Sequence, residues 1–183
     1  ALATFTVTVA EPPHAPYADA GGPYEAVAGF ALTLDGSGST DIDPTDYITR
    51  YEWDLDLDET PDLVGAAAAT NHTFLTPGTV NIALRVTDNG VMNNGTNLVS
   101  EWHYTTVQVA TNRPPVAAPG GPYAVLEDVA LPLDGSASYD PNSLTPILSW
   151  EWDFDGDGTF DASGPTAQAV WPTGGVFSVR LVV

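Results

Sequence analysis

An internal repeat with an offset of 99 residues constrains this chain more than any other feature. Residues 16–24 return at 115–123, residues 34–41 at 133–140, and residues 52–56 at 151–155. The offset is the same for all three pairs, and 22 of the 47 positions from 16 to 62 are identical to their counterparts. The 183 residues therefore contain two copies of one folding unit of about 100 residues, and any fold must accommodate the unit twice.

Each repeat has the sequence pattern of successive β-strands. Apolar and other residues alternate at 80–86 and again at 177–183, which is the period of a half-buried strand. Further strands are predicted at about 30–35, 47–55, 66–74 and 97–109, separated by turns rich in Gly, Pro, Asp and Asn. About seven short strands per repeat predict an all-β chain of two immunoglobulin-like β-sandwiches in tandem. Trp53 and Trp152 are expected to fill the two cores.

The charge of the chain is strongly one-sided. It has 24 acidic residues, four arginines and no lysine, for a formal net charge of −20 at pH 7. Such a surface repels phosphates and anionic lipid, so nucleic acid is not an expected partner. It also repels itself unless high salt or bound cations screen it. No cysteine is present, and no run of about 18 apolar residues predicts membrane insertion.

Four short motifs of the first repeat, three of which return in the second, resemble the polycystic-kidney-disease (PKD) domain. In the first repeat they are Pro16 to Gly21, Leu34 to Asp41, Trp53 to Asp56, and Val86-Thr87-Asp88. The resemblance implies a seven-stranded sandwich, an extracellular or cell-surface location, and a spacer, adhesive or surface-layer role. The chain departs from the family pattern in its Asp-rich loops after the Trp-Asp motif. The second repeat also stops before the final Thr-Asp.

Two aspartate-rich loops are candidate calcium sites. The second repeat carries Asp at positions 1, 3, 5 and 9 of a loop that begins at residue 153, with Gly at position 6, as in the first half of an EF-hand loop. The matching loop of the first repeat has Glu59 at the position of that Gly. A solvated hairpin turn is the alternative for both loops. The predicted ligands are Asp153, Asp155, Asp157, Thr159 through its carbonyl oxygen, and Asp161, and in the first repeat Asp54, Asp56, Asp58 and Asp62.

The family resemblance implies a third calcium site, where the linker into a PKD module meets the end of the Val-Thr-Asp strand. The matching residues of the first repeat are Asp41, Asp43 and Asp88. The second repeat keeps Asp140 but has Asn142 in place of the second carboxylate. The alternative is that Asp41 and Asp140 cap turns by accepting hydrogen bonds from backbone N–H groups.

No motif for catalysis stands out, so the chain is not expected to be an enzyme. The three histidines are scattered, and neither a nucleophile elbow nor a phosphate loop is present. Asn71 and Asn94 each begin an Asn-x-Thr triplet and are candidate N-glycosylation sites.

The predicted domains are a terminal strand at 1–10 that belongs to a neighbouring module, a first sandwich at 11–110, and an incomplete second sandwich at 111–183. Residues 3–10 resemble the last strand of the first repeat, and Phe5, Val7 and Val9 would point inward. The second repeat lacks a counterpart of residues 97–109. We therefore expect residues 1–10 to complete the second sandwich of another molecule, by donor-strand complementation. The alternative is that the chain is a piece of a longer array of modules.

The sequence thus predicts a calcium-stabilised structural or adhesive module pair from an extracellular filament or surface layer, with copies of itself as the partner. The alternative function is a pair of accessory spacer or substrate-binding modules of a secreted hydrolase, facing a polysaccharide. Exposed aromatic side chains distinguish the two, because a binding face needs a flat row of rings. The candidates for such a row are Trp102, Trp150, Trp171 and Tyr104.

Overall fold

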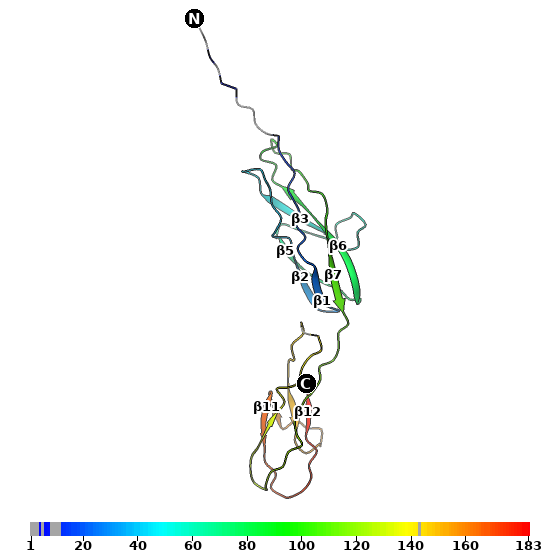
Figure 1. Cartoon of the computed structure of the whole chain (residues 1–183), viewed down its shortest axis with the longest axis vertical. Helices are drawn as coiled ribbons and strands as arrows, with labels where there is room; N and C mark the ends of the chain where they lie inside the picture. Colours follow the sequence, from blue (N-terminus) through cyan, green and yellow to red (C-terminus); the bar gives the residue numbers. More distant parts are fainter. Residues whose placement is uncertain (1–3, 5, 8–11, 143) are drawn as a thin grey trace. The chain divides into compact units, whose positions relative to one another are not determined.

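The computed structural model describes residues 4, 6–7, 12–142 and 144–183. None of these residues lies in a helix, so no helix of this part could cross a membrane. The chain divides into two compact units, Ala1–Thr111 and Asn112–Val183 (Figure 1). The predicted all-β architecture of two tandem units is confirmed.

The first unit is a sandwich of two sheets. The smaller sheet pairs β2 (Ala31–Asp35) with β5 (Ala69–Thr73), antiparallel. The larger sheet has the spatial order β1-β7-β6-β3-β4, and only its β1–β7 pair is parallel. Its strands are β1 (Tyr24–Val27), β7 (His103–Ala110), β6 (Gly78–Asp88), β3 (Ile48–Asp54) and β4 (Leu63–Gly65).

Most strands of the first unit lie where the sequence pattern predicts them, with two differences. The strand predicted at 97–109 begins only at His103, and before it only Val99 forms an isolated bridge, to Thr87. The edge strands β1 and β4 were not predicted. Both are short and pair on one side only, so they carry little of the alternation by which a strand is recognised.

The core of the first unit lies between the two sheets, around Trp53. The side chain of Trp53 is 1% exposed, which confirms its predicted place in the core. Apolar residues from both sheets pack in the same cluster, and the alternating residues of β6 supply three of them. The fully buried members besides Trp53 are Leu34, Ile82, Leu84, Val86, Val107 and Ala20.

The second unit repeats part of this arrangement. β8 (Leu131–Asp134) pairs with β11 (Thr166–Ala169), as β2 pairs with β5. β9 (Glu151–Asp153) lies between β10 (Ala162–Ser163) and β12 (Arg180–Val182). Trp152 on β9 is completely buried, again as predicted. Of the strand predicted at 177–183, only Arg180–Val182 forms.

Counterparts of β1 and β7 are missing from the described residues of the second unit. The counterpart of β1 would be 123–126, which follows the same Gly-Gly-Pro-Tyr sequence that leads into β1. In the first unit β1 pairs with β7 and with no other strand. Residues 112–183 contain no segment equivalent to β7, so 123–126 has no strand with which to form a ladder.

Close packing explains the glycine in the Leu-Asp-Gly-Ser motif of each repeat. A Cβ atom on Gly36 would lie 2.7 Å from Leu84 Cδ2, and one on Gly135 would lie 2.6 Å from Leu181 Cδ2. Each leucine lies opposite the central tryptophan, on the neighbouring strand of the same sheet, in the Trp53–Leu84 and Trp152–Leu181 pairs. The glycine therefore lets the chain pass directly over the core.

One buried carboxylate in the first unit is neutralised by two of the four arginines. Glu52 on β3 is 4% exposed, and its oxygens lie 2.7 Å from Arg50 Nη2 and 2.9 Å from Arg85 Nε. The guanidinium of Arg85 also lies over the ring of Trp102, 4.6 Å from its centroid. Two of the four cationic side chains of the chain thus offset the charge of this one buried acid.

We expect Gly36→Ala to destabilise the first unit by about 2 kcal/mol, because the new methyl group overpacks the core beside Leu84. Chemical denaturation followed by tryptophan fluorescence measures the loss. Gly65→Ala is the matched control, since its Cβ would meet no atom closer than 3.9 Å. Equal stabilities for the two variants would contradict the packing explanation.

Candidate metal centre

Three aspartates of the first unit converge where β6 ends. Asp88 is the last residue of β6, and Asp41 and Asp46 lie in the loop between β2 and β3. One carboxylate oxygen of each lies within 4.8 Å of those of the other two. Two segments that are far apart in sequence therefore place three negative charges in the space that one cation would fill.

The carboxylate of Asp88 is completely buried but only half satisfied. Its Oδ1 accepts hydrogen bonds from the N–H groups of Gly90, at 2.9 Å, and Leu98, at 2.8 Å. Its Oδ2 is buried and has no hydrogen-bond partner. The same holds for Asp41, whose Oδ1 accepts the Asp43 N–H at 2.8 Å while its buried Oδ2 has no partner. Buried, unpartnered carboxylate oxygens are costly, so two of them in one cluster point to a ligand that binds there.

The raised pKa of Asp41 and the repulsion between the three carboxylates also favour a ligand at this cluster. Burial raises the pKa of Asp41, and the charges of Asp43, Asp88 and Asp46 raise it further, against the lowering effect of the Asp43 N–H. Three carboxylates at this distance repel one another strongly in a medium of reduced dielectric constant. A proton or a cation relieves the repulsion, and hard divalent cations prefer oxygen ligands.

The structure differs from the predicted ligand set at one position and adds another. Asp43 is turned away from the cluster toward the linker. Its Oδ2 accepts the His14 backbone N–H at 2.7 Å, and its Oδ1 lies 3.1 Å from His14 Nδ1. These interactions lower the pKa of Asp43, the backbone N–H most of all. Asp46 takes the place in the cluster, and its carboxylate also accepts the N–H of Met92. Only the tertiary structure brings Asp46 to the end of β6.

The second unit shows the same contact at the counterpart of Asp43. Asn142, the counterpart of Asp43, accepts the Arg113 backbone N–H through its Oδ1 at 2.6 Å. Both side chains thus fix the linker to the start of their own unit, and this task needs an acceptor oxygen but no charge. Asp46 corresponds to Thr145, and the second unit has no counterpart of Asp88. Among the described residues, the three-aspartate cluster is therefore found in the first unit.

The loop after β3 is stabilised by its own backbone. Asp54 is 2% exposed and accepts the N–H groups of Leu57, at 2.7 Å, and Glu59, at 2.8 Å, on its two oxygens. Leu57 and Glu59 have positive φ angles of 62° and 69°, which L-residues rarely adopt. The bonds to Asp54 hold the chain in this conformation. Asp54, Asp56 and Asp58 lie within 4.8 Å of one another, whereas Asp62 bonds the Leu55 N–H at 2.7 Å.

The loop after β9 has the same geometry with glycines at the two turn positions. Gly156 and Gly158, with φ of 80° and 90°, donate to the two oxygens of Asp153 at 2.6 and 3.1 Å. Burial acts to raise the pKa of Asp153, but these donors, the N–H of Asp155 and the charge of Arg180 together lower it. Asp153, Asp155 and Asp161 form the close group. Asp157 lies outside that group and accepts the Thr159 N–H at 2.6 Å.

The three clusters differ in how many oxygens of their buried aspartate accept a hydrogen bond. Asp54 and Asp153 receive backbone hydrogen bonds on both oxygens, so each loop holds its shape with its own donors. Asp88 receives none on Oδ2. Calcium stays a prediction for all three clusters, and the cluster at the end of β6 differs by combining convergent oxygens with buried oxygens that have no hydrogen-bond partner.

The other predicted site residues are placed as follows. Asn94 is exposed in a turn, whereas Asn71 on β5 is exposed but its Oδ1 accepts the Thr33 hydroxyl at 2.7 Å. Of the predicted intersubunit strand, Phe5 and Val9 lie outside the described residues. Val7 is 69% exposed and lies in no strand of its own chain.

Comparison with known proteins identifies one family. A profile described as the PKD domain matches residues 13–100 and again residues 112–183. No curated protein matches the chain. The two matches cover both units and most of the chain, in agreement with the internal repeat.

Solved structures with detectable similarity are distant. One is a nucleoside hydrolase-related hypothetical protein from Saccharophagus degradans, associated with carbohydrate metabolism, with 24% identity and a TM-score of 0.39. That match covers 54% of this chain and 26% of the other, so this chain spans about a quarter of its length. The PKD domain from KIAA 1837 protein has 23% identity and a TM-score of 0.36, over 66% of this chain and 100% of the other. A carbohydrate-binding module of the β-sandwich superfamily has 17% identity and a TM-score of 0.43, over 86% and 54%.

We expect Asp43→Asn to fold with nearly unchanged stability, because an amide oxygen still accepts the His14 N–H, as Asn142 does for Arg113. Asp43→Ala removes this acceptor and should lower the thermal midpoint of the first unit by about 5 °C, the scale of one lost hydrogen bond in a domain of this size. Calorimetry of the two variants makes the comparison. An equal loss in both would show instead that the negative charge is needed.

Proposed function

The chain belongs to the PKD domain family, and we propose that its two sandwiches are structural or adhesive modules of an extracellular filament or surface layer, stabilised by calcium. The observation that carries the proposal is the buried Asp88 carboxylate, which has an unpartnered oxygen in a cluster with Asp41 and Asp46. A module whose buried charges need a cation suits an environment in which calcium is abundant, as it is outside cells.

Calcium fits this donor set better than other common cations. The donors are carboxylate oxygens alone, which hard cations prefer over softer metals. They come from two separate segments, and calcium tolerates the irregular geometry that such a site offers, whereas magnesium demands a near-ideal octahedron. Bound there, calcium would offset two of the three negative charges. Asp41 and Asp46, as ligands from the loop, and Asp88, as a ligand from β6, would then hold the loop at 41–46 against the end of β6.

The position of the cluster suits a mechanical role. Asp43, within the same loop, fixes the linker at His14, and Asp46 holds the turn at Met92. A cation at the cluster therefore stiffens the segment by which the chain enters its first unit. Stiff module entrances are what a rod or filament needs, because they transmit force between neighbouring units.

We place this pair outside the cell and assign it no catalytic role of its own. Head-to-tail association with other copies is the assembly that fits best, with residues 1–10 completing the second sandwich of a neighbouring molecule. The net charge of −20 opposes this association at low salt, so we expect it to require calcium or high salt, which screen the repulsion between the chains.

The polysaccharide-binding alternative has less support from the aromatic side chains. Trp102 is half-buried beneath Arg85, and Trp171 is half-buried in a stack with Phe177. Trp150 is also half-buried, and of the four candidates only Tyr104 is largely exposed, at 61%. A flat row of exposed rings would need more than one of them on the surface.

We expect calcium to stabilise the first unit by about 3 kcal/mol at a hundredfold excess over its dissociation constant. Asp88→Asn should abolish this response because the cation loses a buried ligand. The same variant should be as stable as the wild type, or more so, in chelator, since the amide removes one of three repelling charges. Calorimetry with calcium and with chelator, together with isothermal titration, measures both effects.

Glu25→Gln is the matched control, since it removes one exposed charge from β1, away from the three ligands. It should keep the full calcium response. An Asp88→Asn variant that is stabilised by calcium as strongly as the wild type would overturn the assignment of the site.

The calcium response should also depend on pH. Burial raises the pKa of Asp41 above 3.8. At a pH between 3.8 and the raised value, the ion-free folded chain therefore holds a proton on Asp41 that the unfolded chain has lost. The ion-free protein therefore loses stability as the pH rises from 3.8 through the raised pKa. Calcium displaces this proton, so its stabilising effect should be largest at neutral pH and should shrink on acidification. Thermal unfolding with and without calcium, from about pH 7.5 to about pH 4, tests this; a response independent of pH would contradict it.

A further inference from the structure

The loop between β6 and β7 is closed at its base by Asp88. Oδ1 of Asp88 accepts the N–H groups of Gly90, at 2.9 Å, and Leu98, at 2.8 Å, and its own N–H donates to the Leu98 carbonyl oxygen at 3.1 Å. Further along the loop, the N–H groups of Asn93 and Gly95 donate to the carbonyl oxygen of Gly90, at 3.0 and 2.8 Å. The loop therefore keeps a defined shape, although most of it lies outside the strands.

Asn94 lies in the turn of this loop and begins the triplet Asn94-Gly95-Thr96. All three residues are exposed. Asn94 has a φ of 54°, in the left-handed region that Asn adopts more readily than most residues. In the part of the chain that the structure describes, its side chain has no hydrogen-bond partner. A Cβ on Gly95 would meet no atom within 4 Å, so the space beside Asn94 is open.

Asn71 begins a triplet of the same type, Asn71-His72-Thr73, but this triplet lies within β5. Asn71 is paired with Thr33 in the β2–β5 ladder, and its Oδ1 accepts the Thr33 hydroxyl at 2.7 Å. The ring of His72 meets that of Phe74 edge-on, with the two centroids 4.7 Å apart. A transferase must bind an acceptor triplet in its own active site, and this one cannot enter such a site without leaving the ladder. A loop outside the strands opens at a much lower cost in free energy.

We propose that Asn94 is a site of N-glycosylation and that Asn71 is not modified in the folded chain. The sugar donor is an oligosaccharide carried on a lipid pyrophosphate, and Asn-x-Thr is the triplet that accepts it. The side-chain amide nitrogen of Asn94 forms a bond to the anomeric carbon of the oligosaccharide and gives up one proton. The bond from that carbon to the pyrophosphate oxygen breaks, and the lipid pyrophosphate leaves with the electron pair.

This inference rests on the proposed extracellular location, because N-glycosylation is a modification of exported chains. It adds to the proposed function a modification of the loop beside the calcium site. The second unit, residues 112–183, contains no Asn-x-Ser or Asn-x-Thr triplet, so the modification distinguishes the two repeats.

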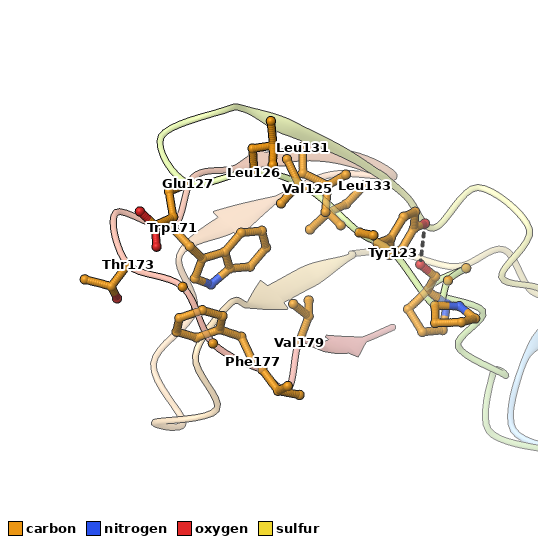
Figure 2. Close-up of a pocket in the computed structure, with 18 of the residues that line it drawn as sticks. Tyr123, Val125, Leu126, Glu127, Leu131, Leu133, Trp171, Thr173, Phe177 and Val179 are labelled. Atoms are coloured by element: carbon orange, nitrogen blue, oxygen red, sulfur yellow. Dashed lines mark hydrogen bonds between the residues drawn. The ribbon is translucent and has the colours of Figure 1, made fainter.

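A glycan at this position also accounts for two exposed apolar side chains. Val91 and Met92, two and three residues before Asn94, are 57% and 39% exposed. In the second unit, Val125 and Phe177 are exposed to a similar extent, but Figure 2 shows them on opposite sides of a pocket that they share. Val91 and Met92 instead lie in an exposed turn. A glycan is bulky and strongly hydrated, so on Asn94 it covers them.

The glycan and the cation can be present together. Asp88 Oδ1 and the Asp46 carboxylate hold the loop through backbone N–H groups, including that of Met92. The side chain of Asn94 takes part in none of these contacts. A glycosylated chain should therefore keep the calcium response of the bare chain.

Transfer to the folded chain in vitro tests the choice of site. The purified full-length chain is incubated in calcium with a lipid-linked oligosaccharide and an oligosaccharyltransferase that accepts Asn-x-Thr, and mass spectrometry locates the glycan. Synthetic peptides of residues 68–75 and 91–98 are treated in parallel. Both peptides should be modified, because each carries its triplet in a flexible chain. The folded chain should carry the glycan on Asn94 and none on Asn71.

Thr96→Ala should abolish transfer to the folded chain, since it removes the hydroxyl of the triplet and keeps Asn94 in its turn. Thr96→Ser should restore transfer, and Thr73→Ala, the matched change in the other triplet, should leave it unchanged. A folded chain that is modified at Asn71 would overturn the proposal. So would a folded chain that stays unmodified at Asn94, whether the 91–98 peptide is accepted or refused.

Retention on a hydrophobic column tests whether the glycan covers the loop. Val91→Ser with Met92→Gln should shorten the retention of the bare chain and leave that of the glycosylated chain almost unchanged. Equal shifts in the two forms would overturn the covering role. The transfer reaction does not depend on where the chain resides, and the calcium response of Asp88→Asn is measured on the bare chain. Each result can therefore fail or hold independently of the other.

Discussion

The position of one strand between two others governs the structure of both units. In the first unit β7 pairs with β1 and with β6, and its valines close the core over Trp53. In the second unit the same tryptophan is buried, but no strand occupies that position among the described residues, and only Leu133, Trp152 and Ala169 form its buried cluster. The large sheet then shrinks to three short strands. The comparison shows that β9, β10 and β12 assemble around the tryptophan without β7, whereas a ladder at the β1 position depends on it.

Buried negative charge is the second constraint, and the chain compensates its buried carboxylates in different ways. Glu52 is buried and neutralised by Arg50 and Arg85. Asp54 and Asp153 are buried and satisfied by backbone N–H groups of their own loops. The cluster around Asp88 is satisfied only in part, since backbone N–H groups reach one oxygen of Asp88 and one of Asp41, and the other oxygen of each is buried without a partner. Of the described residues, this cluster alone combines convergent carboxylates with buried carboxylate oxygens that lack a partner, although acidic residues occur throughout the chain.

The sequence alone determined the repeat, the all-β class, the two core tryptophans and the Asp-rich turns, because periodicity and short motifs are local signals that a strand or turn carries with it. It also indicated Asp41 and Asp88, through their place in the family motifs. It did not show that Asp46 lies in the cluster and Asp43 outside it. Both residues belong to one loop, and only the fold decides which carboxylate faces β6 and which faces His14. The late start of β7 and the pairing of β1 were decided by tertiary structure as well. A short edge strand forms when a neighbouring strand offers hydrogen bonds, and that neighbour lies about 80 residues away along the chain.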